Sequence, residues 1–463
     1  MERQVYQRLL RWKNSSRRKP LLLKGARQTG KTYLLNEFGR LEYDSCVYIN
    51  FEKDPSAAGF FSDRLDALEL IRNLSIYTGK KIRPERDLIV FDEVQVSNRA
   101  LSSLKYFQEQ APQYHIAAAG SLLGIAVSGP GSFPVGKVNF LDLYPLSFLE
   151  FLQAVGAQEL KELVQNTQNP EPYAEPLHKE LLRHLRWYYF TGGMPEAVSH
   201  FASSGDPHEV REIQNEILES YVLDFAKYAA GPDIPKLRMV WDSLPAQLAR
   251  ENKKFVFSAL KKSARLRDFD NAIQWLEKAG LIHRVFRVTA AMRPLKAYAQ
   301  ENIFKMFALD TGLLGAMAGL SAQVTVHGDM IFREFKGALV ENYVAQELKA
   351  AKGMALYYWE SSGSAEVDFV CEDSQSIYPL EAKAGVNPRS KSLLSFDQKY
   401  NPPWLVRTSQ LNLKRDVRIL NIPLYAVSLF PMQLEDMSSE DNFYPASSLA
   451  LKDGGCKDGI QNR

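Results

Sequence analysis

The chain has 463 residues, a formal net charge of +3 at pH 7, 45% hydrophobic residues and 24% charged residues. These values exclude a fibrous or largely disordered chain, and so small a charge does not by itself indicate nucleic acid or an acidic membrane as a partner. A chain of this length exceeds a single hydrophobic core, so roughly two to four domains are expected.

The cysteines and the N-terminal residues favour a reducing compartment. Cys46, Cys371 and Cys456 are far apart and lack the spacing of zinc sites or disulfide frameworks. The N-terminal residues hold no apolar run long enough for a signal peptide, and the longest nearly apolar stretch, 116–127, is shorter than the roughly 20 residues that cross a bilayer. We therefore expect a cytoplasmic protein with no membrane partner.

Short apolar runs alternate with helical segments between residues 20 and 150. The runs read PLLLKG, CVYINFE, LIVFDE, HIAAAGS and VNFLDLY. Nearly continuous Val, Ile and Leu runs separated by helices are typical of parallel strands that are buried on both faces. This part of the chain is therefore predicted to be an α/β nucleotide-binding domain.

Helical periodicity dominates the middle of the chain. Residues 150 to 235 show helical spacing of aromatic and leucine side chains, interrupted at Gly192, Gly193 and Pro195. Residues 236 to 290 then favour three short helices followed by the strand LIHRVFRV, which is the order of a winged helix.

A second α/β pattern begins near Phe335. The predicted helix EFKGALVENYVAQELKAAK precedes three predicted strands, ALYYWE, AEVDFVCE and SIYPLEAKA, and the composition turns polar after Pro431. The predicted division of the chain is a nucleotide-binding core at 1–160, a helical lid at 161–235, a winged helix at 236–300, a second α/β domain at 301–430 and a flexible tail at 431–463.

Residues 25 to 32 read GARQTGKT and match the phosphate-binding loop G-x-x-x-x-G-K-[ST] at every fixed position. The glycines let backbone N–H groups surround the phosphates, Lys31 reaches the β and γ oxygens and takes part in catalysis, and the Thr32 hydroxyl ligates Mg²⁺. The motif therefore predicts a site for ATP with Mg²⁺. Its expected ATP-binding residues are Gly25, Ala26, Arg27, Gln28, Thr29, Gly30, Lys31 and Thr32.

The strand LIVFDE ends in two acids at the edge of the sheet where open α/β sheets bind ligands. Asp92 is expected to hold Mg²⁺ through water, and Glu93 to act as the base that polarises the attacking water, a carboxylate that P-loop kinases lack. Ser121, at the end of HIAAAGS, is either an ATP-binding residue near the γ-phosphate or a turn serine. Hydrolysis is therefore expected, with no arginine finger assignable from the sequence.

A second constellation lies near the C-terminus. Asp368 and Glu381 stand on consecutive predicted strands, Lys383 follows Glu381 by two residues, and Glu341 lies on the preceding helix. Two carboxylates on adjacent strands can hold a metal ion against a phosphodiester, and a lysine on the same face can orient or deprotonate water. The alternative is that these residues form solvent-facing ion pairs.

The constellation resembles the PD-(D/E)xK nuclease superfamily, and residues 15 to 430 resemble bacterial and archaeal AAA-type P-loop ATPases that carry such a domain, of unknown function, at the C-terminus. The resemblance implies a RecA- or AAA-like parallel sheet with a helical lid, a winged helix and a restriction-endonuclease-like α/β domain. It also implies metal ligands Glu341, Asp368 and Glu381 and a catalytic Lys383. It rests on the segments GARQTGKT, FDEVQ, GSLLG, YPLSFLEF, TGGMPEAV, FALDTGLL and GALVENYVAQEL through EAKAG.

One position departs from the family pattern. Many relatives carry a Gly-Arg pair before the fifth strand, where this chain has Gly136 and Lys137. Lysine cannot supply the two-pronged contact of an arginine finger, so a role for Lys137 at a neighbouring nucleotide is doubtful.

Two functions from different classes follow. The first is an ATPase coupled to the nuclease-like module and acting on DNA, with endonuclease activity if the C-terminal site cuts. The second is an ATP-dependent switch in which the winged helix and an inactive nuclease-like domain bind protein partners or a second copy of the chain. Glu93 disfavours a third class, the P-loop kinases.

Overall fold

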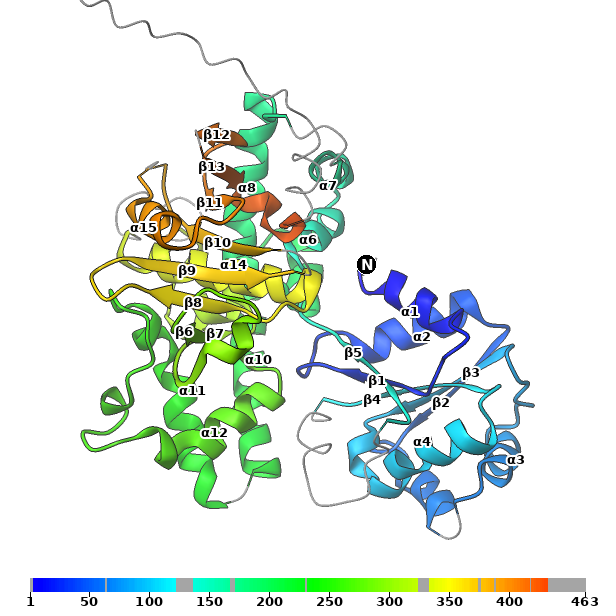
Figure 1. The fold of residues 1–463 in the computed structure, drawn as a ribbon. Coiled ribbons are helices and arrows are strands. Elements are labelled where there is room, and N and C mark those ends of the chain that lie inside the picture. Colours follow the sequence, from blue (N-terminus) through cyan, green and yellow to red (C-terminus); the bar gives the residue numbers. More distant parts are fainter. Residues whose placement is uncertain are drawn as a thin grey trace, which may run out of the picture.

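The computed structural model describes residues 3–62, 65–121, 136–166, 171–229, 231–323, 333–373, 376–386, 389–416 and 418–431. Two lobes are visible in Figure 1: one contains the blue and cyan N-terminal elements, and the other contains the helices and strands that follow them. The tail predicted at 431–463 lies outside the described residues except for its first residue.

The first lobe is a parallel sheet of five strands in the order β2-β3-β4-β1-β5. The parallel sheet predicted for this part of the chain is therefore confirmed. The strands are β1 (Leu21–Lys24), β2 (Ser45–Asn50), β3 (Asp87–Asp92), β4 (His115–Ala119) and β5 (Asn139–Asp142), and the helices are α1 (Tyr6–Lys13), α2 (Lys31–Glu42), α3 (Ala67–Thr78) and α4 (Asn98–Gln110).

Helices cover both faces of this sheet, which explains the uninterrupted apolar runs of its strands. Leu22 lies in a core with side chains of α3 and α4, whereas its neighbours Leu21 and Leu23 lie in a core with α1 and α2. Alternate side chains of a strand point to opposite faces, so a sheet buried on both faces needs apolar residues at every position.

The second lobe combines helices with a mixed sheet around one large core. Its helices are α6 (Phe148–Ala154), α7 (Gln158–Gln165), α8 (Glu175–Thr191), α9 (Pro195–Ser204), α10 (Pro207–Tyr228), α11 (Ile234–Leu248), α12 (Leu266–Lys278), α13 (Thr311–Met317), α14 (Arg333–Lys352) and α15 (Lys391–Tyr400). Nowhere in the described ranges does a helix combine the length and the apolar character needed to cross a bilayer.

The sheet of this lobe has eight strands in the order β12-β13-β11-β10-β9-β8-β6-β7. Helix α14 followed by β8, β9 and β10 is the predicted order of one helix and three strands. The strands are β6 (Ile282–Val288), β7 (Ala299–Ala308), β8 (Tyr357–Glu360), β9 (Glu366–Glu372), β10 (Ile377–Ala382), β11 (Leu405–Ser409), β12 (Lys414–Asp416) and β13 (Ile419–Pro423).

The segment predicted as a winged helix differs from the expectation in two respects. The second of its three expected helices is only the short 3-10 turn η4 (Phe257–Ala259), between α11 and α12. Strand β6 pairs antiparallel with β7 and parallel with β8, so this hairpin continues the eight-stranded sheet and the predicted boundary at 300/301 falls inside β7. Both edges of β6 thereby find backbone hydrogen-bonding partners, which a separate small domain would not provide.

Candidate functional site

The loop of residues 25 to 32 joins the end of β1 to the start of α2 and needs its glycines for two different reasons. Gly30 has a φ of 90° where the helix begins, a backbone conformation that residues with a Cβ rarely adopt. Gly25 has a φ of 152°, and a Cβ there would collide with the Leu143 carbonyl. The loop can therefore keep this path only with glycine at both positions.

Lys31 lies folded back over its own loop. Its Nζ donates hydrogen bonds to the carbonyl oxygens of Gly25 at 3.0 Å and Ala26 at 2.7 Å. Burial lowers the pKa of Lys31 to about 8, although the negative charges of Glu93 and Asp92 act in the opposite direction. The loop thus holds a buried positive charge beside the backbone that would surround a phosphate.

Thr32 and Asp92 join the loop to the end of β3. The Thr32 hydroxyl donates to Asp92 Oδ2 at 2.7 Å, and the Tyr48 hydroxyl donates to the same oxygen at 2.6 Å. Adjacent hydroxyl and carboxylate oxygens are the ligands that Mg²⁺ prefers, so these residues fit the metal expected from the motif. The sequence interpretation missed Tyr48. Its position near the carboxyl end of β2, which pairs with β3, could have indicated that it lies close to Asp92.

Glu93 directly follows β3 with a φ of 48°, in the left-handed region that a glutamate seldom occupies. Such a conformation costs about 1–3 kcal/mol and is found preferentially at functional sites. Glu93 Oε2 accepts hydrogen bonds from Gln95 Nε2 at 2.5 Å and from the Ser121 hydroxyl at 3.4 Å. The structure therefore brings Ser121 next to the carboxylate that was predicted to act as the base.

Helix α10 of the second lobe contacts the phosphate-binding loop at Arg27. The Arg27 guanidinium pairs with Asp224 at 2.6 Å, and the Tyr221 hydroxyl donates to the Arg27 carbonyl at 3.0 Å. Arg27 also lies 3.9 Å from Glu52, which pairs with Lys227 of the same helix at 3.0 Å. A residue predicted only to bind ATP is thus also a contact between the lobes.

Arg3, which the sequence interpretation did not single out, fastens the loop to α6. Its guanidinium donates to the Thr29 carbonyl at 3.1 Å and to the Tyr144 carbonyl at 2.6 Å, and it pairs with Glu150 at 3.1 Å. Arg3 is buried, so three separate segments share one desolvated charge. By contrast, Lys137 lies away from the loop and pairs with Glu109 of α4 at 3.0 Å.

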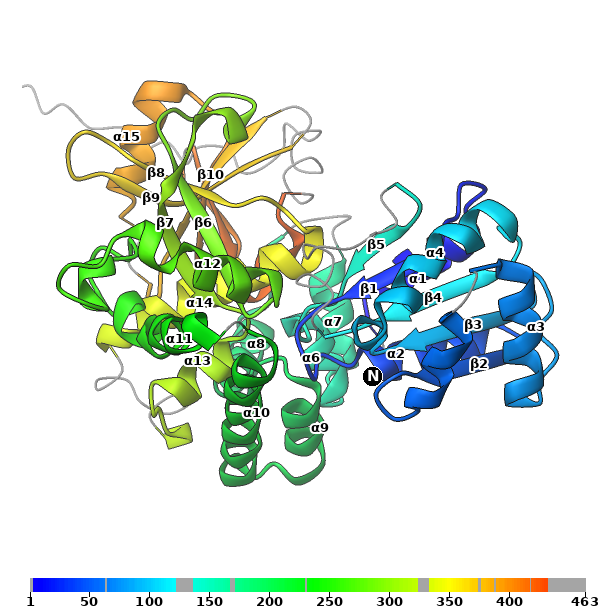
Figure 2. The same ribbon diagram turned by 90° about the horizontal axis from the view of Figure 1, so that it is seen from below.

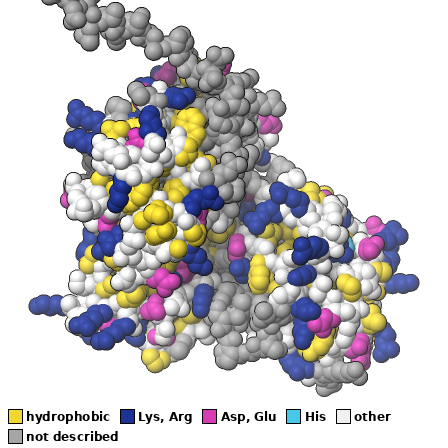
Figure 3. Space-filling model, viewed as in Figure 1, with side chains coloured by type: hydrophobic (Ala, Val, Ile, Leu, Met, Phe, Trp, Pro, Cys, Tyr) yellow, Lys and Arg dark blue, Asp and Glu magenta, His cyan; other side chains and the backbone are white. Residues whose placement is uncertain are grey.

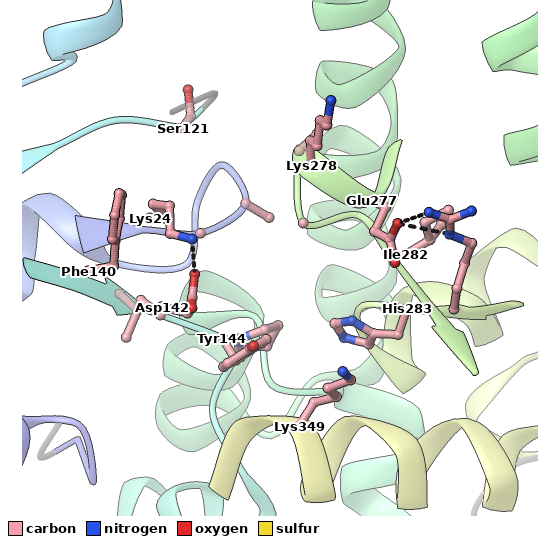
Figure 4. A pocket seen from close by; sticks show the side chains of 17 residues that line it. Lys24, Ser121, Phe140, Asp142, Tyr144, Glu277, Lys278, Ile282, His283 and Lys349 are labelled. Carbon is pink, nitrogen blue, oxygen red and sulfur yellow. Dashed lines mark hydrogen bonds and ion pairs between the residues drawn. The ribbon is translucent and has the colours of Figure 1, made fainter. Parts of the chain in front are cut away.

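A cavity of about 420 Å³ lies between the loop and the second lobe. Gly25, Ala26 and Tyr144 form part of one wall, and the turn from α12 to β6, including Gly280, forms part of the other. In Figure 4 Lys24, Phe140 and Asp142 lie on the sheet side, and Lys278, His283 and Lys349 lie on the opposite side. The phosphate-binding loop therefore borders the junction of the two lobes, where a bound nucleotide can affect both.

The predicted C-terminal constellation is assembled by the fold. Lys383 pairs with Glu381 at 2.7 Å, and Asp368 Oδ2 accepts a hydrogen bond from the Ala382 amide at 2.9 Å. Glu341 and Asp368 lie on either side of Lys305, a buried lysine that the sequence interpretation did not consider. Across the described residues, no group of three or more His, Cys, Asp or Glu side chains is arranged to hold a metal ion, and the ligand role of Glu341, Asp368 and Glu381 stays a prediction.

The comparisons with known proteins agree with the first lobe and leave the second without a functional assignment. Residues 17–152 match the family model of an AAA domain, so this part of the chain is an AAA-type P-loop ATPase domain. Residues 182–324 and 336–426 match two domains of unknown function, DUF8612 and DUF4143. A comparison with curated proteins finds no match.

Two solved structures are similar to the chain at low identity. A Walker-type ATPase of Pyrococcus abyssi is 14% identical, with a TM-score of 0.42 and coverage of 68% of this chain and 95% of that chain. The Orc1 protein of Aeropyrum pernix, solved in complex with DNA, is 12% identical, with a TM-score of 0.28 and coverage of 69% of this chain and 93% of that chain.

Proposed function

We propose that the AAA-type domain binds ATP with Mg²⁺ in the loop of residues 25 to 32 and hydrolyses it. The observation that carries this proposal is the 2.7 Å hydrogen bond between Thr32 and Asp92, because it joins the two elements that must share one Mg²⁺. The buried Lys31 and the strained Glu93 supply the other two groups that hydrolysis requires.

Each residue has a definite task in this reaction. Lys31 would exchange its two carbonyl partners for phosphate oxygens, and Thr32 and Asp92 would hold Mg²⁺, which supplies neutralising charge to the phosphates when bound. Glu93 orients a water molecule and accepts its proton as the bond to the γ-phosphorus forms, while Ser121 holds the Glu93 carboxylate. ADP leaves with the electron pair of the broken bond.

The roles of Lys31 and Glu93 are tested by separating binding from turnover. Lys31→Ala should abolish ATP binding, whereas Glu93→Gln should bind ATP with unchanged affinity and hydrolyse it about 10²–10⁴ times more slowly, since general-base catalysis contributes that much. Binding is measured with a fluorescent ATP analogue and turnover by phosphate release. Glu37→Gln, a half-buried glutamate on α2 that forms an ion pair only with Arg40 in the described structure, is the matched control.

Turnover at the wild-type rate in Glu93→Gln would remove the assignment of Glu93 as the base. Equal ATP affinity in Lys31→Ala and wild type would remove the loop itself as the nucleotide site, because the lysine charge is required for the phosphates.

We further propose that hydrolysis acts on the second lobe through α10. Arg27 is the shared element: its backbone lies in the loop that surrounds the phosphates, and its guanidinium pairs with Asp224. A bound phosphate that shifts the loop would therefore also shift the Arg27 side chain, which is paired with Asp224 of α10. This coupling would transmit the state of the nucleotide to the second lobe through the loop itself.

Cleavage of DNA by the eight-stranded sheet is a second candidate function. Its support is the assembly of Glu341, Asp368, Glu381 and Lys383 at one place in the fold. Incubation of wild type and Lys383→Ala with plasmid DNA, Mg²⁺ or Mn²⁺, and ATP tests it: cutting that is lost with Lys383 supports a nuclease, and no cutting by wild type removes this candidate. On the face seen in Figure 3, Lys and Arg side chains are interspersed with acidic and hydrophobic ones.

The alternative of an ATP-dependent switch with protein partners uses the same ATP site. Absence of DNA cleavage together with intact ATP hydrolysis is the result that would favour it.

A further inference from the structure

A buried lysine lies at the centre of the acidic cluster where the sequence predicts a metal ion. Lys305, on β7, has no exposed side-chain surface. Its Nζ lies 3.5 Å from Glu341 Oε2 and 3.7 Å from Asp368 Oδ1, and it forms a closer ion pair with Glu366. The three carboxylates come from α14 and β9, so one ammonium group connects three elements of the second lobe.

Cations already lie beside the carboxylates that a metal would use, although Glu341 Oε2 and Glu381 Oε2 accept no hydrogen bond from the described residues. Glu341 divides its two oxygens between Lys253 and Lys305. Asp368 directs Oδ1 toward Lys305, while its Oδ2 accepts the hydrogen bond from the Ala382 amide. Glu381, the third predicted ligand, is paired with Lys383 instead.

The charges of the cluster also favour the ammonium. The three carboxylates lie close enough to attract the Lys305 ammonium, which offsets the cost of burying it. Counted with every group ionised, Lys253, Lys305 and the three carboxylates leave one negative charge, which is too little for a buried divalent cation in addition.

We propose that Lys305 is a built-in cation that takes the place of a divalent metal ion between Glu341, Glu366 and Asp368. The eight-stranded sheet then holds neither Mg²⁺ nor Mn²⁺ at this position, which excludes the metal-dependent DNA cleavage considered above, and its acids stabilise the joint between β7, β9 and α14. Removal of the ammonium leaves two net negative charges around a space that oxygen ligands surround, which suits a divalent cation. The inference does not depend on ATP hydrolysis.

The test measures metal binding directly, without nucleotide or DNA. All proteins carry Asp92→Asn, so that the phosphate-binding loop contributes no metal site. Binding of Mn²⁺ is followed by isothermal titration calorimetry and by loss of the free Mn²⁺ signal in electron paramagnetic resonance. The background protein should show no Mn²⁺ site that depends on Asp368, whereas Lys305→Met should gain one site with at least tenfold tighter binding.

The gained site should disappear again in Lys305→Met with Asp368→Asn, which removes one of the acids. Should Lys305→Met fail to fold by circular dichroism, Lys305→Gln takes its place, because the glutamine amide removes the positive charge and can still form hydrogen bonds with the buried carboxylates. That protein should likewise bind Mn²⁺ more tightly than the background does.

Two results overturn the proposal. One is Mn²⁺ binding by the background protein that is lost with Asp368→Asn, because the cluster would then accept a metal beside its lysine. The other is a folded Lys305 variant that gains no Mn²⁺ site, because Lys305 would then not occupy a metal position. Neither result bears on the ATP site, whose own test rests on Lys31 and Glu93.

Discussion

At the scale of single residues, the protonation of Lys31 should govern the affinity for ATP. The ammonium is desolvated in its loop, which lowers its pKa to about 8, and phosphate oxygens would raise that pKa by supplying negative charge. Nucleotide binding is therefore linked to the protonated lysine. Affinity is highest below the pKa of the free loop and is lost as the pH rises through that value.

The expected result is a roughly tenfold fall in ATP affinity between pH 7 and pH 9 at fixed free Mg²⁺, because the protonated fraction falls by about that factor around a pKa of 8. Fluorescence titration with an ATP analogue measures it. Lys31→Arg, whose guanidinium stays charged over this range, is the control and should give a flat profile if it binds. A wild-type affinity that rises with pH would contradict the assignment.

At the scale of structural elements, α10 is one part of the second lobe that contacts the phosphate-binding loop. Asp224 and Tyr221 lie one helical turn apart and both bind Arg27, one through its guanidinium and one through its carbonyl. A helix held at two points on one residue follows the movement of that residue. Nucleotide binding should therefore change, through Arg27, how readily the backbone hydrogen bonds of α10 open.

Asp224→Asn tests this coupling, since it removes the ion pair and keeps the size of the side chain. ATP should slow amide hydrogen exchange in α10 of the wild type, and the variant should lose at least half of this protection while binding ATP within about threefold of wild type. Glu216→Gln, at an exposed position on the same helix, should behave as wild type does. If ATP protected α10 as fully in Asp224→Asn as in wild type, the Arg27–Asp224 ion pair would not carry the effect of the nucleotide.

The turn between α8 and α9 is a second element, and its backbone leaves no space for a larger residue. The Gly193 amide donates to Asp310 Oδ2, and the Gly193 carbonyl accepts from the Leu146 amide, both at 2.6 Å. A Cβ on Gly193 would collide with the Leu146 backbone. The glycine thus allows two backbones to approach closely beside a buried aspartate.

Gly193→Ala should destabilise the protein by about 2–3 kcal/mol, within the range for steric conflict in a packed interior. The measurement is the thermal unfolding midpoint by differential scanning fluorimetry, which should fall by several degrees. Gly59→Ala is the control, because a Cβ there meets no atom within 4 Å and its midpoint should hardly change. An unchanged midpoint for Gly193→Ala would mean that the backbones separate without penalty.

At the scale of the whole molecule, the division of the chain into two sheets does not follow the domain boundaries predicted from the sequence. The five-stranded sheet ends with β5, and the eight-stranded sheet takes β6 from the predicted winged helix, β7 from across its boundary at 300/301, and the strands that follow α14 (Figure 2). Strand β6 pairs with both β7 and β8. A cut at 300/301 therefore removes the strand that joins β7 to the rest of the sheet.

A fragment of residues 301–431 should consequently fail to fold, whereas a fragment of residues 145–431 retains the whole sheet with its helices and should unfold cooperatively. Circular dichroism during heating distinguishes the two. A cooperative transition in the shorter fragment would show that the sheet does not need β6.

The arrangement of the proposed ATP site was largely predictable because its signal is local. Residues 25 to 32 are consecutive, and Asp92 and Glu93 follow a strand whose place in a parallel sheet is evident from its apolar run. Carboxyl ends of parallel strands meet at one edge, so the loop and the two acids had to lie near each other. Tyr48, Arg3 and Asp224 were missed because each lies far along the chain from the residue that it contacts, which is Asp92, Thr29 or Arg27.

The sequence by itself determined the phosphate-binding loop, the parallel strands of the first lobe and the helix with three strands near the C-terminus, since each follows from spacing within a short segment. Only the tertiary structure decided that α10 contacts Arg27, that β6 and β7 belong to the larger sheet, and that Lys305 lies among Glu341, Glu366 and Asp368. The reason is that a lysine in a strand is equally compatible with solvent or with a buried cluster. Which of the two it occupies depends on carboxylates contributed by segments that lie dozens of residues away.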